Sequence, residues 1–374
     1  MSLLDMKVSN GVLDKPPSIE INNKIRLIEL FSGVGSQAMA LKRLNVPFEH
    51  YKSIDFDKHA VIAYNSIHNT NFSPLNIKKV SGADLEIVDT DEYTYIMTYS
   101  FPCVDLTLSG KQKGMAKNSN TRSGLLWEVE RILKEVDNLP QILLMENVTQ
   151  VHGKNNLDAF NEWTSFLESL GYKNYVEDLN AKNFNVPQNR NRTFMVSILG
   201  DYSYEFPKPI PLKKTVCDYL EDIEPNEENL KKARELVIPI NDTMVGIKQE
   251  TIKGYIECYI GGVTDLAYPT SLTRNGRVLN NGFLCPTIQH NTPLEIFKVL
   301  NVNGDIRRLT PKESWRLMDF TDEDFEKAKE VLSETQLYKK AGNSIVVCIL
   351  SAIFSQLNIK DCVSWNDMIK EKNK

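Results

Sequence analysis

Residues 25–44 read IRLIELFSGVGSQAMALKRL, and this stretch decides the fold. Residues 25–31 form an apolar run of strand length, whereas residues 36–44 carry apolar side chains at helical spacing. Gly33-Val34-Gly35 closes the first run, and its glycines let the backbone approach a ligand closely. Ligands bind to doubly wound sheets where a strand ends and a helix begins. The stretch therefore predicts a strand, a ligand-binding turn and a helix.

The same alternation continues to residue 199. We expect further strands at 48–54, 95–100, 141–145 and 193–199, and helices at 58–67, 124–136 and 157–170. Strands that alternate with helices predict an α/β fold with a doubly wound, mostly parallel sheet. Residues 307–319 and 343–357 are again helical in pattern, so we expect the end of the chain to rejoin this sheet.

The pattern changes between residues 200 and 304. This region contains three closely spaced prolines, an acidic stretch and short β-like pieces separated by glycines. It predicts a second, smaller and irregular β-containing domain. The expected organisation is a loose N-terminal arm (1–23), a discontinuous α/β domain (24–199 plus 305–374) and an inserted second domain (200–304).

The composition is that of a soluble globular protein, with 41% hydrophobic and 25% charged residues in 374. The longest apolar runs, 142–145 and 345–350, are too short to span a bilayer, and the N-terminus lacks a signal-peptide pattern. Six cysteines without a C-x-x-C motif favour a reducing cytoplasm and no metal site, since Cys258, Cys285 and His290 form only a scattered trio. The net charge of −5 argues, taken alone, against nucleic acid as a partner.

Two residues that follow predicted strands are candidates for chemistry. Cys103, in Phe101-Pro102-Cys103, is placed like a nucleophile, although a small buried cysteine is the alternative. Glu146 lies at the same edge of the sheet, where a carboxyl group kept protonated by burial could donate to a ring nitrogen. The alternative for Glu146 is a carboxylate that caps the following turn.

Two further groups point to ligands. Asp55 ends the second strand, where a carboxylate can accept both hydroxyls of a ribose or can instead cap the next helix. Gln188, Arg190 and Arg192 alternate along an extended segment and so share one side. Two guanidinium groups and an amide suit an anionic or carbonyl-rich ligand, and a solvated basic turn is the alternative.

These motifs stand in an order that resembles the C5-cytosine DNA methyltransferases. The series is FSGVG (31–35), DFDK (55–58), FPC (101–103), SGKQKG (109–114), ENV (146–148), QNRNR (188–192), RLTPKE (308–313), RLM (316–318) and GNSI (342–345). Each motif is weak alone, but their number and order are specific, and they cover residues 24–199 and 305–357. The resemblance departs from the family pattern at Glu29, Ser36, Ser100 and Asp55, none of which removes a group needed for chemistry.

The resemblance implies a Rossmann-like AdoMet-dependent methyltransferase, in which residues 24–199 plus 305–374 would be the catalytic domain and residues 200–304 the target-recognition domain. AdoMet would be converted to S-adenosyl-L-homocysteine, and no metal is expected. Cys103 would add to C6 of a cytosine, Glu146 would bond its N3 and exocyclic amine, and Arg192 would hold its carbonyl edge with help from Arg190 and Gln188. The cytosine must leave the helix for this reaction. The implied cofactor residues are Phe31, Ser32, Gly33, Val34, Gly35, Asp55, Phe56, Asp84, Leu85, Pro102, Leu125, Asn343 and Ser344. Asp89 and Asp91 are alternatives to Asp84 at the adenine.

The implied partner is double-stranded DNA. We expect contacts from Ser109, Lys111, Gln112, Lys113, Gln188, Arg274, Arg277 and Thr287, the basic members of which would line one cleft together with Arg190 and Arg192. For Arg274 and Arg277 a solvated side chain is the alternative. The expected protein is a monomer that acts in a restriction–modification system, with a separate endonuclease, or as a phage-type orphan enzyme.

Three other functions are alternatives to this one. The first is the tRNA-methylating branch of the same family, whose typical Cys-Phe-Thr tripeptide is absent. The second is a catalytically inactive DNA-binding relative, which the presence of Cys103, Glu146 and Arg192 disfavours. The third, a nicotinamide-dependent oxidoreductase, rests on the Gly-x-Gly turn alone.

Overall fold

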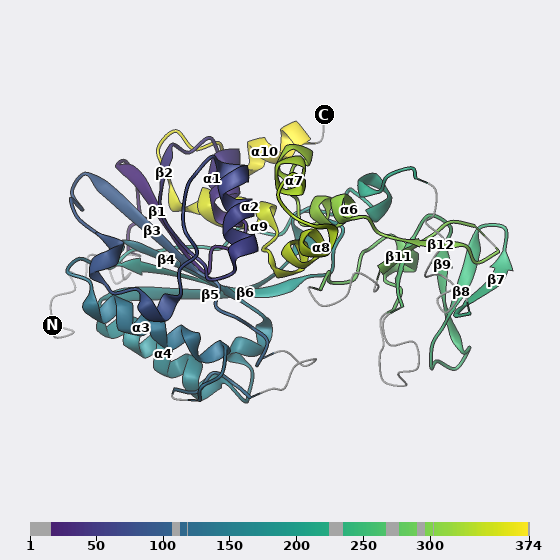
Figure 1. The fold of residues 1–374 in the computed structure, drawn as a ribbon, viewed down its shortest axis with the longest axis horizontal. Coiled ribbons are helices and arrows are strands. Elements are labelled where there is room, and N and C mark those ends of the chain that lie inside the picture. The colour runs from purple at the N-terminus through teal and green to yellow at the C-terminus, as the bar shows by residue number, and fades with distance from the viewer. Residues whose placement is uncertain are drawn as a thin grey trace, which may run out of the picture.

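A six-stranded sheet in the order β2-β1-β3-β4-β6-β5 forms the centre of the molecule (Figure 1). The computed structural model describes residues 16–106, 113–117, 119–223, 235–266, 277–289, 296–301 and 303–372. The strands are β1 (Lys24–Leu30), β2 (Phe48–Ile54), β3 (Tyr93–Tyr99), β4 (Ile142–Asn147), β5 (Tyr172–Asn180) and β6 (Asn191–Leu199). Strands β1 to β4 are parallel, and β6 is antiparallel to β4 and β5. The predicted α/β fold with a mostly parallel sheet is confirmed.

Helices cover both faces of this sheet (Figure 1). Helices α1 (Ser36–Arg43), α2 (Lys58–His68) and α9 (Val347–Phe354) pack on one face, and α3 (Leu126–Glu135) and α4 (Leu157–Ser169) pack on the other. Successive strand residues face opposite sides, so Leu27 joins the first core and Ile28 the second. Strands β3 and β4, in the middle of the sheet, are almost entirely buried on both faces, which made them recognisable in the sequence, whereas the edge strand β2 is only partly buried.

The C-terminal helices differ from the prediction. They are α6 (Pro311–Arg316), α7 (Asp322–Lys329), α8 (Glu334–Asn343), α9 and α10 (Trp365–Lys372). The helix expected at 307–319 begins later, because residues 306–308 pair as a strand. The run Glu334–Leu357 has the length and apolar composition of a membrane span, but 78% of its most apolar window is buried, as in a core helix.

Part of the predicted loose arm is packed against the sheet domain. Ile19 and Ile21 are 8% and 2% exposed and belong to the main hydrophobic core. The Ile21 amide donates to the Asn358 carbonyl at 3.2 Å, and Ile21 forms an isolated bridge with Ile359. Residues 16–23 are therefore a docked segment. Burial of Ile19 and Ile21 stabilises the docked position, although the sequence around these two residues is polar.

Two small antiparallel sheets form a second unit at one end of the molecule (Figure 1). One contains β7 (Val237–Asn241), β8 (Met244–Lys248) and β9 (Tyr255–Tyr259), and the other β10 (Val263–Asp265), β11 (Ile296–Val299) and β12 (Ile306–Arg308). They share a core that includes Val245, Ile247, Phe297 and Val299. The predicted smaller β-containing domain is confirmed.

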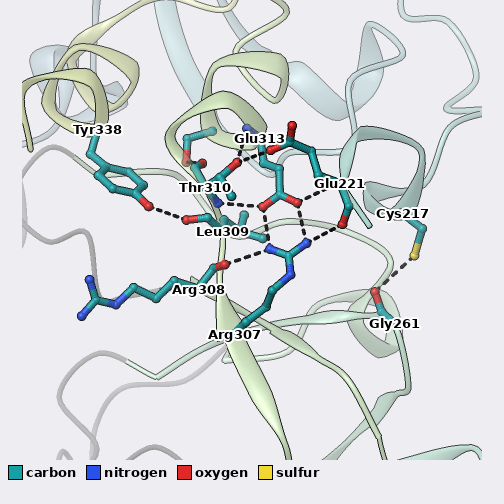
Figure 2. Close-up of polar contacts among 10 residues, drawn as sticks. Cys217, Glu221, Gly261, Arg307, Arg308, Leu309, Thr310, Glu313 and Tyr338 are labelled. Carbon is teal, nitrogen blue, oxygen red and sulfur yellow. Dashed lines mark hydrogen bonds and ion pairs between the residues drawn. The ribbon is translucent and has the colours of Figure 1, made fainter. Parts of the chain in front are cut away.

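A buried ion pair joins the segments that lead into and out of this second unit (Figure 2). Arg307 of β12 donates to both Glu313 carboxylate oxygens at 2.9 and 2.6 Å, and the side chains are 3% and 0% exposed. Arg307 also donates to the Glu221 carbonyl at 2.7 Å, while the Glu221 amide donates back to Glu313 at 2.7 Å. The pair thus ties Glu221, β12 and α6 together.

Loss of this pair should cost far more stability than loss of an exposed one. We expect Arg307→Ala to lower the free energy of unfolding by about 3–5 kcal/mol, because it leaves a buried carboxylate unpaired. Arg316→Ala is the matched control, since Arg316 makes a similar two-point pair with Asp322 at 28% and 49% exposure. It should cost less than about 1 kcal/mol. Equal losses in urea unfolding would show that the buried pair has no special role.

Candidate active site

The carboxyl ends of the four parallel strands lie in register. Leu30 of β1 pairs with Ile54 and Tyr99, and Tyr99 pairs with Met145. The residues that follow these four, in the order of the strands, are Asp55, Phe31, Ser100 and Glu146. Strands about 4.8 Å apart place this row within about 14 Å. The pairing of the strands therefore brings these four residues to one edge of the sheet.

The turn after β1 has an unusual backbone. Phe31, Gly33 and Gly35 have φ values of 59°, 57° and 83°, in the left-handed region. A bulky residue such as Phe31 rarely adopts this conformation, and strain of this kind concentrates at functional sites. A Cβ on Gly33 would meet nothing within 4 Å, whereas one on Gly35 would lie 2.3 Å from His68 Nε2. Gly33 therefore faces open space, and Gly35 packs against α2.

Asp55 links this turn to the end of β2. Its carboxylate accepts the Gly33 amide at 3.0 Å and the Asp57 amide at 2.8 Å. Burial raises the pKa of Asp55, and these two amides oppose that rise. Phe56, the next residue, is 72% exposed although it is a large aromatic side chain. A carboxylate beside open space and an exposed aromatic ring fit a nucleoside, in agreement with the predicted AdoMet site.

The other predicted cofactor residues differ in how far they are buried. Asp84 is exposed, and the Ser81 amide and hydroxyl, each at 2.7 Å, lower its pKa. Leu125 lines a pocket of about 560 Å³ with Gly124 and Glu128 of α3. Val34 and Leu85 are 1% and 0% exposed, so they lie behind the site and present almost no surface to a ligand, which corrects their assignment.

The C-terminal segment returns to this edge, as the motif order required. Lys340 of α8, only 3% exposed, donates to Asp57 at 2.6 Å, two residues beyond Asp55. Asn343 at the end of α8 is exposed, and Ser344 is buried, with its hydroxyl donating to the Lys340 carbonyl at 2.6 Å. Asn343 is thus able to meet a ligand, whereas Ser344 fixes the backbone beside it.

The loop that carries Cys103 is held by two residues that the sequence reasoning did not assign. The Asn147 amide, 2% exposed at the end of β4, donates to the Phe101 carbonyl at 2.9 Å. The Ser123 hydroxyl donates to the Pro102 carbonyl at 2.6 Å. Both side chains are small, polar and buried, and Asn147 directly follows Glu146. Asn147 was signalled in the sequence by its position beside a strand end and by its place in the ENV motif (146–148).

Cys103, Glu146 and Arg192 form one electrostatic group. Arg192 Nε lies 3.3 Å from Glu146 Oε1, and the two side chains are 16% and 11% exposed. Burial raises the pKa of Glu146, and the two guanidinium groups of Arg192 and Arg190 oppose the rise. Burial and the Glu146 charge raise the pKa of the Cys103 thiol, and the same arginines lower it. Glu146 is therefore protonated more readily than an exposed carboxylate, and it lies beside the half-buried Cys103 thiol.

Arg190 and Gln188 are buried and face the protein interior. Arg190 donates to the carbonyls of Ile288, Gly342 and Ser344 at 2.8–2.9 Å, and burial lowers its pKa to about 9. The Gln188 side chain donates to the Leu317 carbonyl at 2.8 Å and accepts the Ile288 amide at 3.2 Å. The DNA contact predicted for Gln188 is therefore wrong. Both side chains tie together segments that are distant in the sequence.

The predicted basic cleft is also revised. Arg277 is 2% exposed and donates to the Asp265 carbonyl at 3.2 Å, so it does not face DNA. Lys113 is exposed, and Thr287 is half-buried with its hydroxyl 2.5 Å from the Asn189 carbonyl. Ser109, Lys111, Gln112 and Arg274 lie outside the described residues. Two of the six expected cleft cations, Arg190 and Arg277, are thus structural, because their guanidinium groups are buried and donate to backbone carbonyls.

Comparisons with known proteins found similarity in sequence and in fold. A family model described as C-5 cytosine-specific DNA methylase matches residues 25–358. The chain is 31% identical to the type II methyltransferase M2.ScrFI of Lactococcus lactis subsp. cremoris, over 89% of this chain and 99% of that protein. It is 29% identical to the orphan methyltransferase M.SssI of Spiroplasma monobiae, over 89% and 97%. The S. pombe Dnmt2 methyltransferase structure is similar in fold, with a TM-score of 0.61 and 19% identity over 90% and 98%.

The two glycines of the turn should respond differently to a methyl group. Alanine in the left-handed region costs about 1–2 kcal/mol at either position. Gly35→Ala should destabilise further, because its Cβ would overlap His68 and Tyr64. Gly33→Ala should instead mainly weaken AdoMet binding, because its Cβ would enter open space. Urea unfolding and AdoMet titration separate the two effects, and equal stability losses would contradict this account.

The reactivity of Cys103 should depend on its charged neighbours. We expect Glu146→Gln to lower the thiol pKa and speed iodoacetamide alkylation of Cys103 at pH 7.5, by about 3- to 10-fold. Arg192→Met should raise the pKa and slow the reaction, because it removes the opposing positive charge. Mass spectrometry of the Cys103 peptide across pH 6–10 measures both, and exposed Cys217 serves as the internal control. Identical pH profiles in the two variants would disprove this coupling.

Proposed function

Because the chain belongs to the C-5 cytosine-specific DNA methylase family, we propose that it methylates C5 of a cytosine flipped out of a specific duplex sequence, with Cys103 as the nucleophile. One observation carries the proposal. The register of β1 to β4 brings Asp55 and the open glycine turn to the same row as Glu146, beside Cys103 and Arg192. This arrangement supports a nucleoside site and a nucleophile within reach of each other.

The residues divide the chemistry among them. The Cys103 thiolate forms a bond to C6, which makes C5 electron-rich. Protonated Glu146 donates to N3 and so stabilises the charge that this addition places on the ring. Arg192 orients Glu146, and we assign to it the further role of holding the base at its carbonyl edge. When bound, AdoMet supplies an electrophilic methyl group for C5. A base then removes the C5 proton, and the bond to Cys103 breaks.

AdoMet dependence is a property of the family, and the turn suits this cofactor. Asp55 and exposed Phe56 would hold the ribose and adenine, and the open space over Gly33 would admit the methionine part. Asn343 and half-buried Pro102 and Leu125 would close the site. The Asp84 carboxylate is exposed and is our choice for the adenine amine.

The region between residues 200 and 304 is our candidate for target recognition. Its segment at Cys285 pairs with the chain at 187–189, next to the strand that carries Arg192. Thr287 and Lys113 are the described candidates for DNA contacts. We further propose a cytoplasmic monomer that needs no bound endonuclease, as expected for either a type II or an orphan enzyme.

The direct test is methyl transfer from labelled AdoMet to duplex DNA and, separately, to tRNA. We expect labelled DNA, with bisulfite sequencing giving one recognition sequence. Cys103→Ser should reduce the rate by roughly 10³-fold or more, and Glu146→Gln by about 10²-fold or more. Cys217→Ser is the matched control, since Cys217 is an exposed cysteine away from the row, and it should retain activity. Labelling of tRNA alone, or full activity of Cys103→Ser, would overturn the proposal.

A further inference from the structure

The carbonyl of Val34, within the glycine turn, is held from behind by a buried histidine of α2. His68 is 5% exposed, and its Nε2 lies 3.0 Å from the Val34 oxygen. His68 and Tyr64, one helical turn apart, both pack against Gly35, where a Cβ would lie 2.3 Å and 2.7 Å from their rings. The turn therefore rests on one face of α2.

A lysine fixes the protonation of this histidine. Lys42 Nζ of α1 lies 2.9 Å from His68 Nδ1. An ammonium group only donates, so Nδ1 accepts and the ring proton must be on Nε2, directed at Val34. Burial, and secondarily the positive charge of Lys42, hold the pKa of His68 well below its usual value, so the ring stays neutral. The result is a hydrogen-bonded chain with one direction, from Lys42 through His68 to Val34.

The turn needs such a restraint because of its own glycines. Without a Cβ, Gly35 has little intrinsic preference for its φ of 83°. On the other side of Val34, the Gly33 amide is already held by Asp55 at 3.0 Å. If the Val34 carbonyl lost its donor, only the hydrogen bond from the Gly35 amide to the Ser32 carbonyl, at 3.0 Å, would hold the peptide between Val34 and Gly35 against rotation. That rotation would change the surface that the turn offers to a ligand.

We propose that His68 is a positioning residue of the cofactor site, whose Nε2–H holds the Val34–Gly35 peptide in the orientation that admits AdoMet. This inference rests on the proposed function, because it takes AdoMet as the ligand of the turn. His68 acts through the backbone of Val34, since its Nε2 is bonded to that carbonyl behind the turn. The Lys42–His68–Val34 chain thus assigns a binding role to Lys42 and His68, which lie outside the family motifs quoted above.

The test compares variants that keep or lose the Nε2 donor. His68→Leu should weaken AdoMet binding about 10-fold, because a single buried hydrogen bond is lost. His68→Gln, whose amide restores a donor near the same place, should remain within about 3-fold of the unchanged protein. Lys42→Met alters an exposed residue, so the fold should persist, and it should weaken binding about 3-fold by freeing the histidine tautomer. Calorimetric titration with AdoMet alone measures these values without turnover.

A control variant separates positioning from general loss of stability. Tyr204→Phe removes a buried hydrogen bond to the Ile353 carbonyl, at 3.1 Å, and Tyr204 packs on Tyr175 of β5, at the opposite edge of the sheet from β2. It should lower the melting temperature without changing AdoMet affinity. For His68→Leu, the larger share of the kinetic loss should fall on KM for AdoMet and the smaller on kcat. Recovery of affinity in His68→Gln would support the proposal.

The outcomes distinguish this inference from the proposed function. If the unchanged protein fails to bind AdoMet, the proposed function is wrong. If it binds AdoMet and His68→Leu binds equally well, or His68→Gln loses as much affinity as His68→Leu, the positioning role is wrong. If His68→Leu fails to fold, an unchanged AdoMet affinity in Lys42→Met would overturn the inference.

Discussion

The parallel pairing of β1 to β4 is the constraint on which the site depends. Parallel strands end at one edge, and here the pairs Leu30–Ile54, Leu30–Tyr99 and Tyr99–Met145 bring the four ends level. A shift of one residue in any strand would turn its side chains to the other face of the sheet. The buried cores on both faces oppose such a shift, so the energy that holds the sheet together also holds Asp55 and Glu146 in one row.

The antiparallel strand β6 completes the site for the same geometric reason. Because β6 runs against β4, its first residues lie where β4 ends, with Thr193 opposite Asn147. Arg192 therefore reaches Glu146, although the two residues are far apart in the sequence. Arg190, two residues earlier, is drawn inward and binds carbonyls from the C-terminal segment and from Ile288. The start of β6 thus places the charged side chain of Arg192 in the site, and Arg190, just before it, binds two other parts of the chain.

The sequence predicted five of the six strands of the sheet. Strands β1, β3 and β4 are mostly buried, and their predicted boundaries were within two residues of those observed. Strand β5 was not predicted, because it lies at the sheet edge and its sequence, YKNYVEDLN, is half polar. Helix α7 was not predicted for a similar reason, since only Phe325 and Ala328 of its eight residues are buried.

The candidate site shows the same limit at the level of single residues. The row from Asp55 to Glu146 followed from strand ends, which local sequence reveals. The burial of Gln188, Arg190 and Arg277 did not, because their carbonyl partners are contributed by other elements, in one case 154 residues away. A guanidinium group in a sequence looks the same whether it will meet a phosphate or a buried carbonyl. The role of His68 was hidden likewise, since Lys42 and Val34 reach it only in the folded protein.

The most direct test of the account is covalent capture of the base by Cys103. A duplex that carries 5-fluorocytosine at the mapped target retains the bond between sulfur and C6, because fluorine cannot leave C5 as a proton does. Incubation with AdoMet and digestion, followed by mass spectrometry, identifies the attached residue. We expect a methylated adduct on Cys103 and none in Cys103→Ser. An adduct on another cysteine, or methylation of ordinary duplex without any adduct on the fluorinated one, would contradict it.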